Sequence, residues 1–231
     1  MNFIIVLLMF SIIVLFHEAG HFSVAKLMGT EIQTFSIGFG PELFGFSRNG
    51  IRYKICLIPL GGYVQMQDLL ELPWYKSALI AVAGPLANLV LFYVTLLSII
   101  YVVNFHDATL LQAFGLVNHD CVEIIKSLLH ITSKDIELVS PIGVAAGMPK
   151  NTSWEDYLNL FLALDLSLGI LNLLPFPMLD GFLLFTSFLE PVIGKQRRKL
   201  FFEYSTIVGF YALVGLMAYV VGKDIFRLFV N

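Results

Sequence analysis

The chain has 231 residues, of which 58% are hydrophobic and 13% are charged, whereas a soluble domain carries about a quarter charged residues. The net charge at pH 7 is −3 and no basic tract is present, which argues against a nucleic-acid partner. Long apolar runs separated by short polar stretches instead predict an all-α integral membrane protein with about four transmembrane helices. We therefore expect its partners to be the lipid bilayer and the transmembrane segments of other proteins.

Each of the four predicted membrane helices approaches the ~20 mainly apolar residues that a span requires. They comprise residues 3–27, 77–103, 158–174 and 201–221. Pro175 and Pro177 end the third helix, because proline lacks an amide donor and blocks helical continuation. We interpret residues 1–231 as one membrane-embedded domain, with a first unit at 1–27 and with the third helix and its following motif at 158–181.

Basic residues are concentrated in two of the loops that connect these helices. Between the first and second helices are Lys26, Arg48, Arg52, Lys54 and Lys76, and between the third and fourth are Lys195, Arg197, Arg198 and Lys199. Because cytoplasmic loops carry the excess of lysine and arginine, both loops are predicted to be cytoplasmic. Residues 104–157 contain more acids than lysines, so this segment and both termini are predicted to be non-cytoplasmic.

A short β-rich region separates the first two helices. Residues 36–64 read as β-runs, and Asn49-Gly50 is typical of a type I′ hairpin turn. The apolar content of these runs is high for a loop in water, which predicts a small membrane-associated β-hairpin. Non-helical backbone at membrane depth must be covered by protein or line a wet cavity.

The motif His17-Glu18-Ala19-Gly20-His21 interrupts the apolar run of the first helix, toward its C-terminal end. Two histidines four residues apart lie on the same face of a helix and can bind one metal ion, and the glutamate beside them can act as a general base. A carboxylate and two imidazoles are costly to hold in an apolar span, by roughly 2.5 kcal/mol or more for a central acid. We therefore interpret the motif as a metal site with Glu18 as its base.

A catalytic zinc ion usually has three protein ligands, so a third ligand is expected elsewhere. Asp180 follows the third helix near the predicted cytoplasmic side, which is also where His21 lies, five residues before Lys26. Asp165 is the alternative, although its place deeper in the third helix favours a packing or polar-cavity role. The remaining histidines lie in the segment predicted to be on the opposite side: His106, His119 and His130.

Taken in chain order, four motifs resemble the site-2 protease family of intramembrane zinc metalloproteases. The resemblance is strongest to its bacterial RseP-type branch, which cleaves anti-sigma factors and signal-peptide remnants. The motifs are His17-Glu18-x-x-His21, Gly-Phe-Gly-Pro at 38–41 with Gly-Gly-Tyr-Val at 61–64, Gly-Pro-Leu-Ala-Asn at 84–88, and Asn-Leu-Leu-Pro-Phe-Pro-Met-Leu-Asp-Gly at 172–181. The match covers most of the chain outside residues 104–131.

This resemblance implies one zinc ion per chain, held by His17, His21 and Asp180, with Glu18 as general base. Asn172 would help to hold the substrate backbone. Among the supporting residues, Asn88 is interpreted first as a packing residue of the second helix, and Pro175 and Pro177 as helix breakers. The implied location is the bacterial inner membrane, and the implied reaction is peptide-bond hydrolysis within or near transmembrane segments.

Two features depart from the family pattern. Phe182 stands where a second glycine is common, and residues 104–157 are too few for the PDZ domains that are usual in this branch. The alternatives are a catalytically silent protein that binds membrane helices and a metal transporter. The intact Glu18 argues against the first, and the lack of internal repeats argues against the second.

Overall fold

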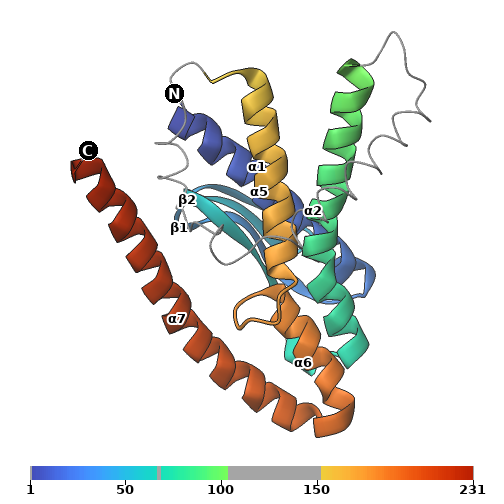
Figure 1. Ribbon diagram of the computed structural model, residues 1–231. Coiled ribbons are helices and arrows are strands. Elements are labelled where there is room, and N and C mark those ends of the chain that lie inside the picture. The colour runs from blue at the N-terminus through green and yellow to red at the C-terminus, as the bar shows by residue number, and fades with distance from the viewer. Residues whose placement is uncertain (1, 67–68, 104–151, 231) are drawn as a thin grey trace.

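The computed structural model describes residues 2–66, 69–103 and 152–230, which form a mostly helical protein with one small sheet (Figure 1). The elements in chain order are α1 (Asn2–Leu27), β1 (Ile32–Arg48), β2 (Ile51–Met66), the 3-10 helix η1 (Leu69–Glu71), α2 (Trp74–Val103), α5 (Trp154–Asn172), α6 (Asp180–Ile193) and α7 (Lys195–Val230). The predicted non-cytoplasmic segment lies outside the described residues except for 152–157, where α5 begins.

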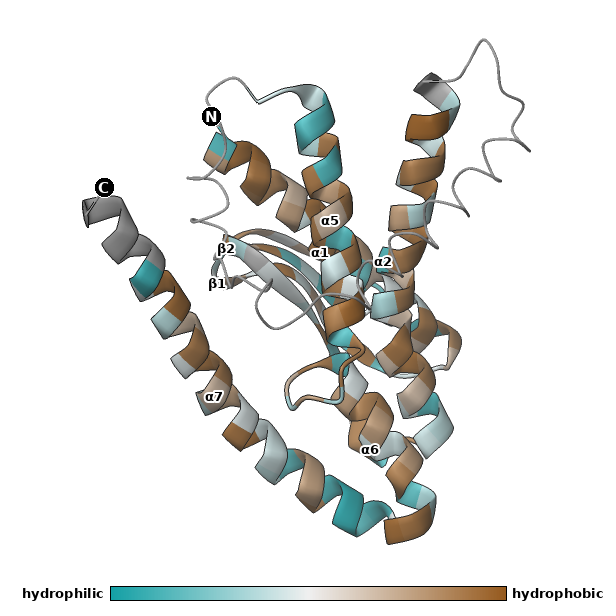
Figure 2. Ribbon diagram, in the orientation of Figure 1, coloured by the Kyte–Doolittle hydropathy of each residue, from teal (hydrophilic) through white to brown (hydrophobic). Residues whose placement is uncertain are grey.

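Three of the described helices are long and apolar enough to cross a membrane, namely Asn2–Leu27, Trp74–Tyr101 and Lys195–Lys223. Their apolar character is visible along α1, α2 and α7 in Figure 2. The chain is therefore a multi-pass membrane protein. The expected third span corresponds to α5, which has 19 residues and does not meet the same criterion because it carries Glu155, Asp156 and Asp165.

The four long helices alternate in direction (Figure 1). α1 and α5 start at the end of the molecule where α2 and α7 finish, so the marked N and C ends lie toward the same end. Ser153 caps α5: its hydroxyl accepts a hydrogen bond from the amide of Asp156, whose side chain in turn accepts from the amide of Ser153. This capping box satisfies amide donors that the first helical turn leaves free.

The sheet is larger than the predicted hairpin, since β1 starts at Ile32 and β2 ends at Met66. Residues 34–37 pair with residues 62–65 and also with 52–55, so residues 62–66 form an edge of the sheet in the part of the chain that the structure describes. Asn49 and Gly50 at the turn both have positive φ, as a type I′ turn requires. The extension has a physical reason: Ile32 is buried against Ala25 of α1 and Ile80 of α2, which anchors the first residue of the sheet to both helices.

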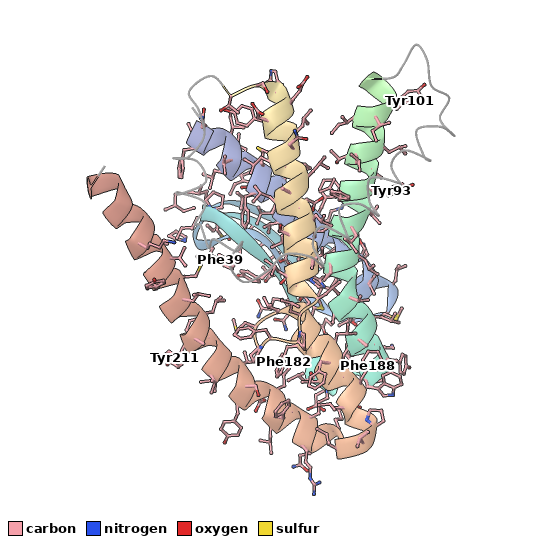
Figure 3. The ribbon with its side chains drawn as sticks, in the orientation of Figure 1. Phe39, Tyr93, Tyr101, Phe182, Phe188 and Tyr211 are labelled. Atoms are coloured by element: carbon pink, nitrogen blue, oxygen red, sulfur yellow. The ribbon has the colours of Figure 1, made fainter. Side chains whose placement is uncertain are left out.

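The third predicted unit, residues 158–181, is divided into two helices. α5 ends at Asn172, a loop follows, and α6 begins at Asp180. Phe182, the departure from the family pattern, is buried and packs against Phe201 and Phe202 of α7 (Figure 3). An aromatic side chain at this position therefore joins α6 to α7.

The last helix starts at Lys195, six residues before the predicted span, because its basic first turns are held by acids. Arg198 is fully buried and pairs with Glu190 of α6, and Lys199 lies 2.9 Å from Glu71. Beyond this anchor α7 leans away from the other helices in Figure 1, and apolar side chains such as Tyr211 are exposed (Figure 3). In a membrane protein such a face contacts lipid.

Candidate metal centre

The histidine pair lies on the buried face of α1. His17 and His21 are four residues apart, about one helical turn, and their Nε2 atoms are 3.2 Å from each other. The two rings meet edge to face, with centroids 4.9 Å apart. The helix thus places both histidines on one face, as predicted.

Asp180 joins this pair from the far end of the chain. Its Oδ2 atom is 2.9 Å from His17 Nε2 and 3.2 Å from His21 Nε2. The ligand atoms of His17, His21 and Asp180 all lie within 4.8 Å of one another, and we call these residues the metal-ligand group. Asp165, the alternative third ligand, is not among them.

The loop between α5 and α6 places Asp180 in this position. Pro175 and Pro177 follow the end of α5, where proline prevents the helix from continuing. Met178 then adopts a φ of 82°, which is unusual for a residue with a side chain and costs of order 1–3 kcal/mol. Asp180 is the first residue of α6, so the positive end of the helix dipole lies beside its carboxylate.

Hydrogen bonds at the Nδ1 atoms of the two rings fix the orientation of their Nε2 atoms toward Asp180. His21 Nδ1 lies 2.7 Å from the carbonyl oxygen of Ile80, and His17 Nδ1 lies 2.8 Å from Oδ1 of Asn88. Because both partners are oxygen acceptors, both Nδ1 atoms carry the proton and donate it. In the neutral form that binds a metal, each ring then turns an unprotonated Nε2 atom toward Asp180.

This arrangement fits a tetrahedral metal ion. Two nitrogen lone pairs and a carboxylate oxygen converge on one point, a set of donors that attracts a cation. Ligand atoms about 2.0–2.1 Å from a tetrahedral zinc ion are about 3.3 Å from each other, and the three separations here are 2.9, 3.2 and 3.2 Å. A hydrogen-bonded second ring nitrogen is also the usual arrangement for a metal-binding histidine.

The second helix approaches the ligands closely at Gly84. A Cβ atom at this position would collide with Nε2 of His21 and would lie 2.8 Å from Nε2 of His17. Only glycine therefore lets α2 lie directly against the metal-ligand group. At Gly84 the second helix thus packs directly on the two histidines.

A cavity of about 500 Å³ opens beside the metal-ligand group. The residues that line it include all three ligands, Glu18 and Asn172. Its other walls come from the sheet, α2, α5, α6 and α7, through residues such as Tyr63, Ile80, Leu168, Leu183 and Leu213. The cavity is large enough for a short stretch of extended peptide to lie beside Glu18 and Asn172.

Glu18 connects the metal-ligand group to the sheet. It is half-buried, and its carboxylate accepts a hydrogen bond from the backbone amide of Val64 in the edge segment of β2. Gly62 lies so close that a Cβ there would be 2.9 Å from Glu18 Cγ. The carboxylate is therefore held beside the ligands while it remains in contact with the cavity.

Asn88 takes a more direct part than the sequence indicated. It is fully buried, and besides accepting from His17 it donates from Nδ2 to Oδ1 of Asp165 over 2.6 Å. No spacing rule pairs residues that are 71 and 77 positions apart in the chain. The signal that was available is Asp165 itself, an acid within an otherwise apolar stretch.

Comparison with known proteins is consistent with this geometry. A family model described as peptidase family M50 matches residues 5–216. A candidate zinc metalloprotease of Chlamydia pneumoniae is 35% identical over 170 residues, which are 58% of this chain and 27% of that protein. Proteins described in the same way from Rhizobium meliloti and Clostridium acetobutylicum are 37% identical over 111 residues and 38% identical over 100 residues.

These matches cover 37% and 39% of this chain in the second and third cases. The chain spans only 27% to 30% of the length of these three relatives. The similarity thus concerns a part of each relative.

Proposed function

Since the chain belongs to peptidase family M50, we propose that it is an intramembrane zinc metalloprotease. It would hydrolyse peptide bonds within or near the transmembrane segments of other membrane proteins, such as anti-sigma factors or signal-peptide remnants. One observation carries this proposal: His17, His21 and Asp180 converge beside Glu18 in one cavity. The names of the relatives agree with the metal, since each is described as a candidate zinc metalloprotease.

The depth of the ligands supports hydrolysis within the bilayer. At a helical rise of about 1.5 Å per residue, His21 is about 9 Å and His17 about 15 Å from the end of α1 at Leu27. The hydrocarbon core of a bilayer is about 30 Å thick. If α1 crosses it as one span, the metal-ligand group lies inside the membrane, on the side of the basic loops.

In this reaction each residue of the site has a separate task. His17, His21 and Asp180 would hold the zinc ion, which when bound acts as a Lewis acid toward a peptide carbonyl and lowers the pKa of water. Glu18 would accept the proton of the attacking water and deliver it to the leaving amine. Asn172, which lines the same cavity, has an amide that can donate to a carbonyl and accept from an amide of the substrate backbone.

The edge of the sheet offers a place for an unwound substrate. Residues 61–64 line the cavity, and within the described part of the chain residues 62–66 pair with β1 on one side only. An extended peptide can add to such an edge through backbone hydrogen bonds. A transmembrane helix must unwind before its carbonyls are accessible, so capture as a strand would favour the form that is cleaved.

We also propose four membrane spans, with both termini non-cytoplasmic and with the basic loops on the cytoplasmic side of a bacterial inner membrane. Two features support α5 as a span in addition to α1, α2 and α7: its 19 residues are about 28 Å long, and its direction alternates with that of its neighbours. Glu155 and Asp156 lie at its first turn, and Asp165 is buried against α2. The charges of α5 are thus at its end or inside the protein.

Purified protein in detergent, incubated with a model transmembrane substrate, tests this function. Cleavage that stops on addition of a zinc chelator and returns when zinc is added back is the expected result. Chelator-resistant cleavage, or no cleavage of any substrate by protein that carries one zinc ion, would contradict it. The Glu18→Gln variant serves as the control for contaminating proteases.

A further inference from the structure

A buried chain of hydrogen bonds leads from the metal-ligand group into α5. His17 Nδ1 is bonded to Oδ1 of Asn88, and Nδ2 of Asn88 is bonded to Oδ1 of Asp165. Asn88 and Asp165 are fully buried, with no exposed side-chain surface. Among the described residues, Asp165 makes no direct hydrogen bond to His17, so the hydrogen-bonded path between them runs through Asn88.

The donors and acceptors along this chain of hydrogen bonds all point in one direction, from His17 through Asn88 to Asp165. Oδ1 of Asp165 is the acceptor of this hydrogen bond, so Asp165 selects the amide orientation in which Asn88 donates from Nδ2. Oδ1 of Asn88 then faces His17 and accepts a hydrogen bond from Nδ1. With its proton on Nδ1, His17 must present an unprotonated Nε2 to the metal-ligand group. If Asn88 were reversed, its NH₂ group would face His17 Nδ1 and would favour the tautomer that cannot bind a metal through Nε2.

Close packing of α2 and α5 allows these hydrogen bonds to form. A Cβ atom at Gly169, one turn after Asp165, would lie 3.2 Å from Cβ of Asn88 and 3.4 Å from the carbonyl oxygen of Pro85. Such contacts are tighter than a side chain normally makes, so glycine is what lets α5 approach α2 here. The close approach brings Asp165 to within 2.6 Å of Asn88.

The position of Asp165 is costly unless it has this task. A carboxylate within an apolar helix costs roughly 2.5 kcal/mol or more, and Oδ2 of Asp165 has no hydrogen-bond partner among the described residues. A group retained only for packing could be apolar at this position. The one hydrogen bond that it makes to the described residues is the bond that orients Asn88, the partner of His17.

We infer that Asp165 is a positioning residue, which acts through Asn88 to fix the tautomer and orientation of His17 for metal binding. This inference rests on the proposed zinc site and extends it by one helix. Hydrogen-bonded partners of metal-binding histidines typically contribute 10–100-fold to metal affinity. The structure thus assigns α5, which supplies no metal ligand, a role in zinc affinity.

The experiment measures zinc affinity by competition with a chelator, in the full chain and in variants at position 165. Asp165→Leu and Asp165→Ala remove the acceptor, and each should weaken zinc binding 10–100-fold. Asp165→Asn keeps an oxygen that can accept from Asn88 and should stay within about threefold of the wild type. Thr186→Val is the matched control, because Thr186 is equally buried but, among the described residues, its hydroxyl bonds to Leu183 of its own helix.

A second readout separates positioning from packing. In zinc-loaded protein with ¹⁵N-labelled histidine, the Nδ1 proton of His17 should be protected from solvent exchange in the wild type and in Asp165→Asn. The same proton should exchange faster in Asp165→Ala. His21 is an internal reference, because its Nδ1 bonds to the backbone of Ile80 and should be unaffected in all variants.

Each outcome is decisive. Wild-type zinc affinity and an unchanged His17 Nδ1 proton in Asp165→Ala would overturn the inference, and so would an Asp165→Asn variant as weak as Asp165→Ala. If Asp165→Leu does not fold, Asp165→Ala gives the same comparison without added bulk. Protein that shows the expected order of zinc affinities but cleaves no membrane substrate would overturn the proposed function while supporting this inference.

Discussion

His17 Nε2 lies 2.9 Å from Oδ2 of Asp180, although 163 positions separate the two residues in the chain. The contact joins the first helix to the start of α6, and His21 lies 3.2 Å from the same oxygen atom. The three proposed metal ligands therefore come from two distant parts of the sequence, and the proposed base, Glu18, lies between the two histidines. Their separate tasks can be tested one at a time.

Glu18→Gln should abolish cleavage and leave zinc bound, because Glu18 is not one of the three ligands. Loss of a general base lowers the rate by about 10²–10⁴-fold. Zinc content by metal analysis and cleavage of a transmembrane substrate should be measured on the same preparation. His17→Ala is the comparison, and equal loss of zinc in both variants would refute this division of roles.

Asp180→Ala should bind little zinc even at a zinc concentration that saturates the wild type, since one of three ligands is removed. Asp165→Ala should still fill its site at saturating zinc, because Asp165 is not in the metal-ligand group and is proposed to act on it through Asn88. Metal analysis of both variants over a range of zinc concentrations checks the order. The reverse order would make Asp165 the third ligand.

Gly84→Ala should reduce zinc binding and cleavage together. The added Cβ atom would collide with His21 Nε2 and would force α2 or the rings to shift. Gly215→Ala on α7 is the matched control, since a Cβ atom there meets nothing within 4 Å. Zinc titration and cleavage assays of both variants distinguish a local clash from a general effect of the substitution, and unchanged zinc binding in Gly84→Ala would contradict the close approach of α2.

The contact between η1 and α7 should weaken at acid pH. Hydrogen bonds from Lys199 and Lys195 lower the pKa of Glu71 below its usual value of 4.5. A lowered pKa means that the stabilisation is present above pH 4.5 and is lost as the pH falls through the pKa of the folded state. Because Glu71 is exposed, the effect on thermal stability should be small and sensitive to salt.

The measurement is the melting temperature of metal-free wild type and Glu71→Gln between pH 7 and pH 3. The variant should be less stable at neutral pH, and the difference should vanish at the acid end. Glu203→Gln, an exposed change on α7, is the control and should have the melting temperature of the wild type at both ends of this pH range. A difference between wild type and Glu71→Gln that persists at pH 3 would contradict the ion-pair account.

Substrate choice should follow the instability of the membrane segment. Glycine costs a helix about 0.8–1.0 kcal/mol per residue relative to alanine, so glycine near the scissile bond should speed cleavage by easing the unwinding of the substrate. A matched set of substrates, varied either in the glycine and proline content of the membrane segment or in the size of a folded outer domain, checks this. Rates that depend steeply on the outer domain and ignore helix stability would contradict it.

The sequence was sufficient for the parts of the site that follow a local rule. The spacing of His17 and His21 on one helix, and the depth of Asp180 deduced from loop charges, were enough to predict the group that the structure brings together. The role of Asn88 was not predictable, because its two hydrogen bonds, one to α1 and one to α5, depend on how closely the helices approach. That distance is set by packing at Gly84 and Gly169, which no periodicity reveals.

The extent of the sheet shows the same limit. Asn49-Gly50 marked the turn correctly, with positive φ at both residues. The first strand starts earlier than its β-pattern indicated because Ile32 is buried against α1 and α2. Tertiary burial decides where a strand begins when its own sequence does not.

The most direct test of the account is to map by mass spectrometry the bond that the purified protein cleaves in a transmembrane substrate reconstituted in lipid vesicles. The account predicts a cleavage position within or near the hydrophobic segment, on the side of the basic loops, with no product from Glu18→Gln. Cleavage confined to the water-exposed parts of the substrate, or the same product from Glu18→Gln, would contradict it.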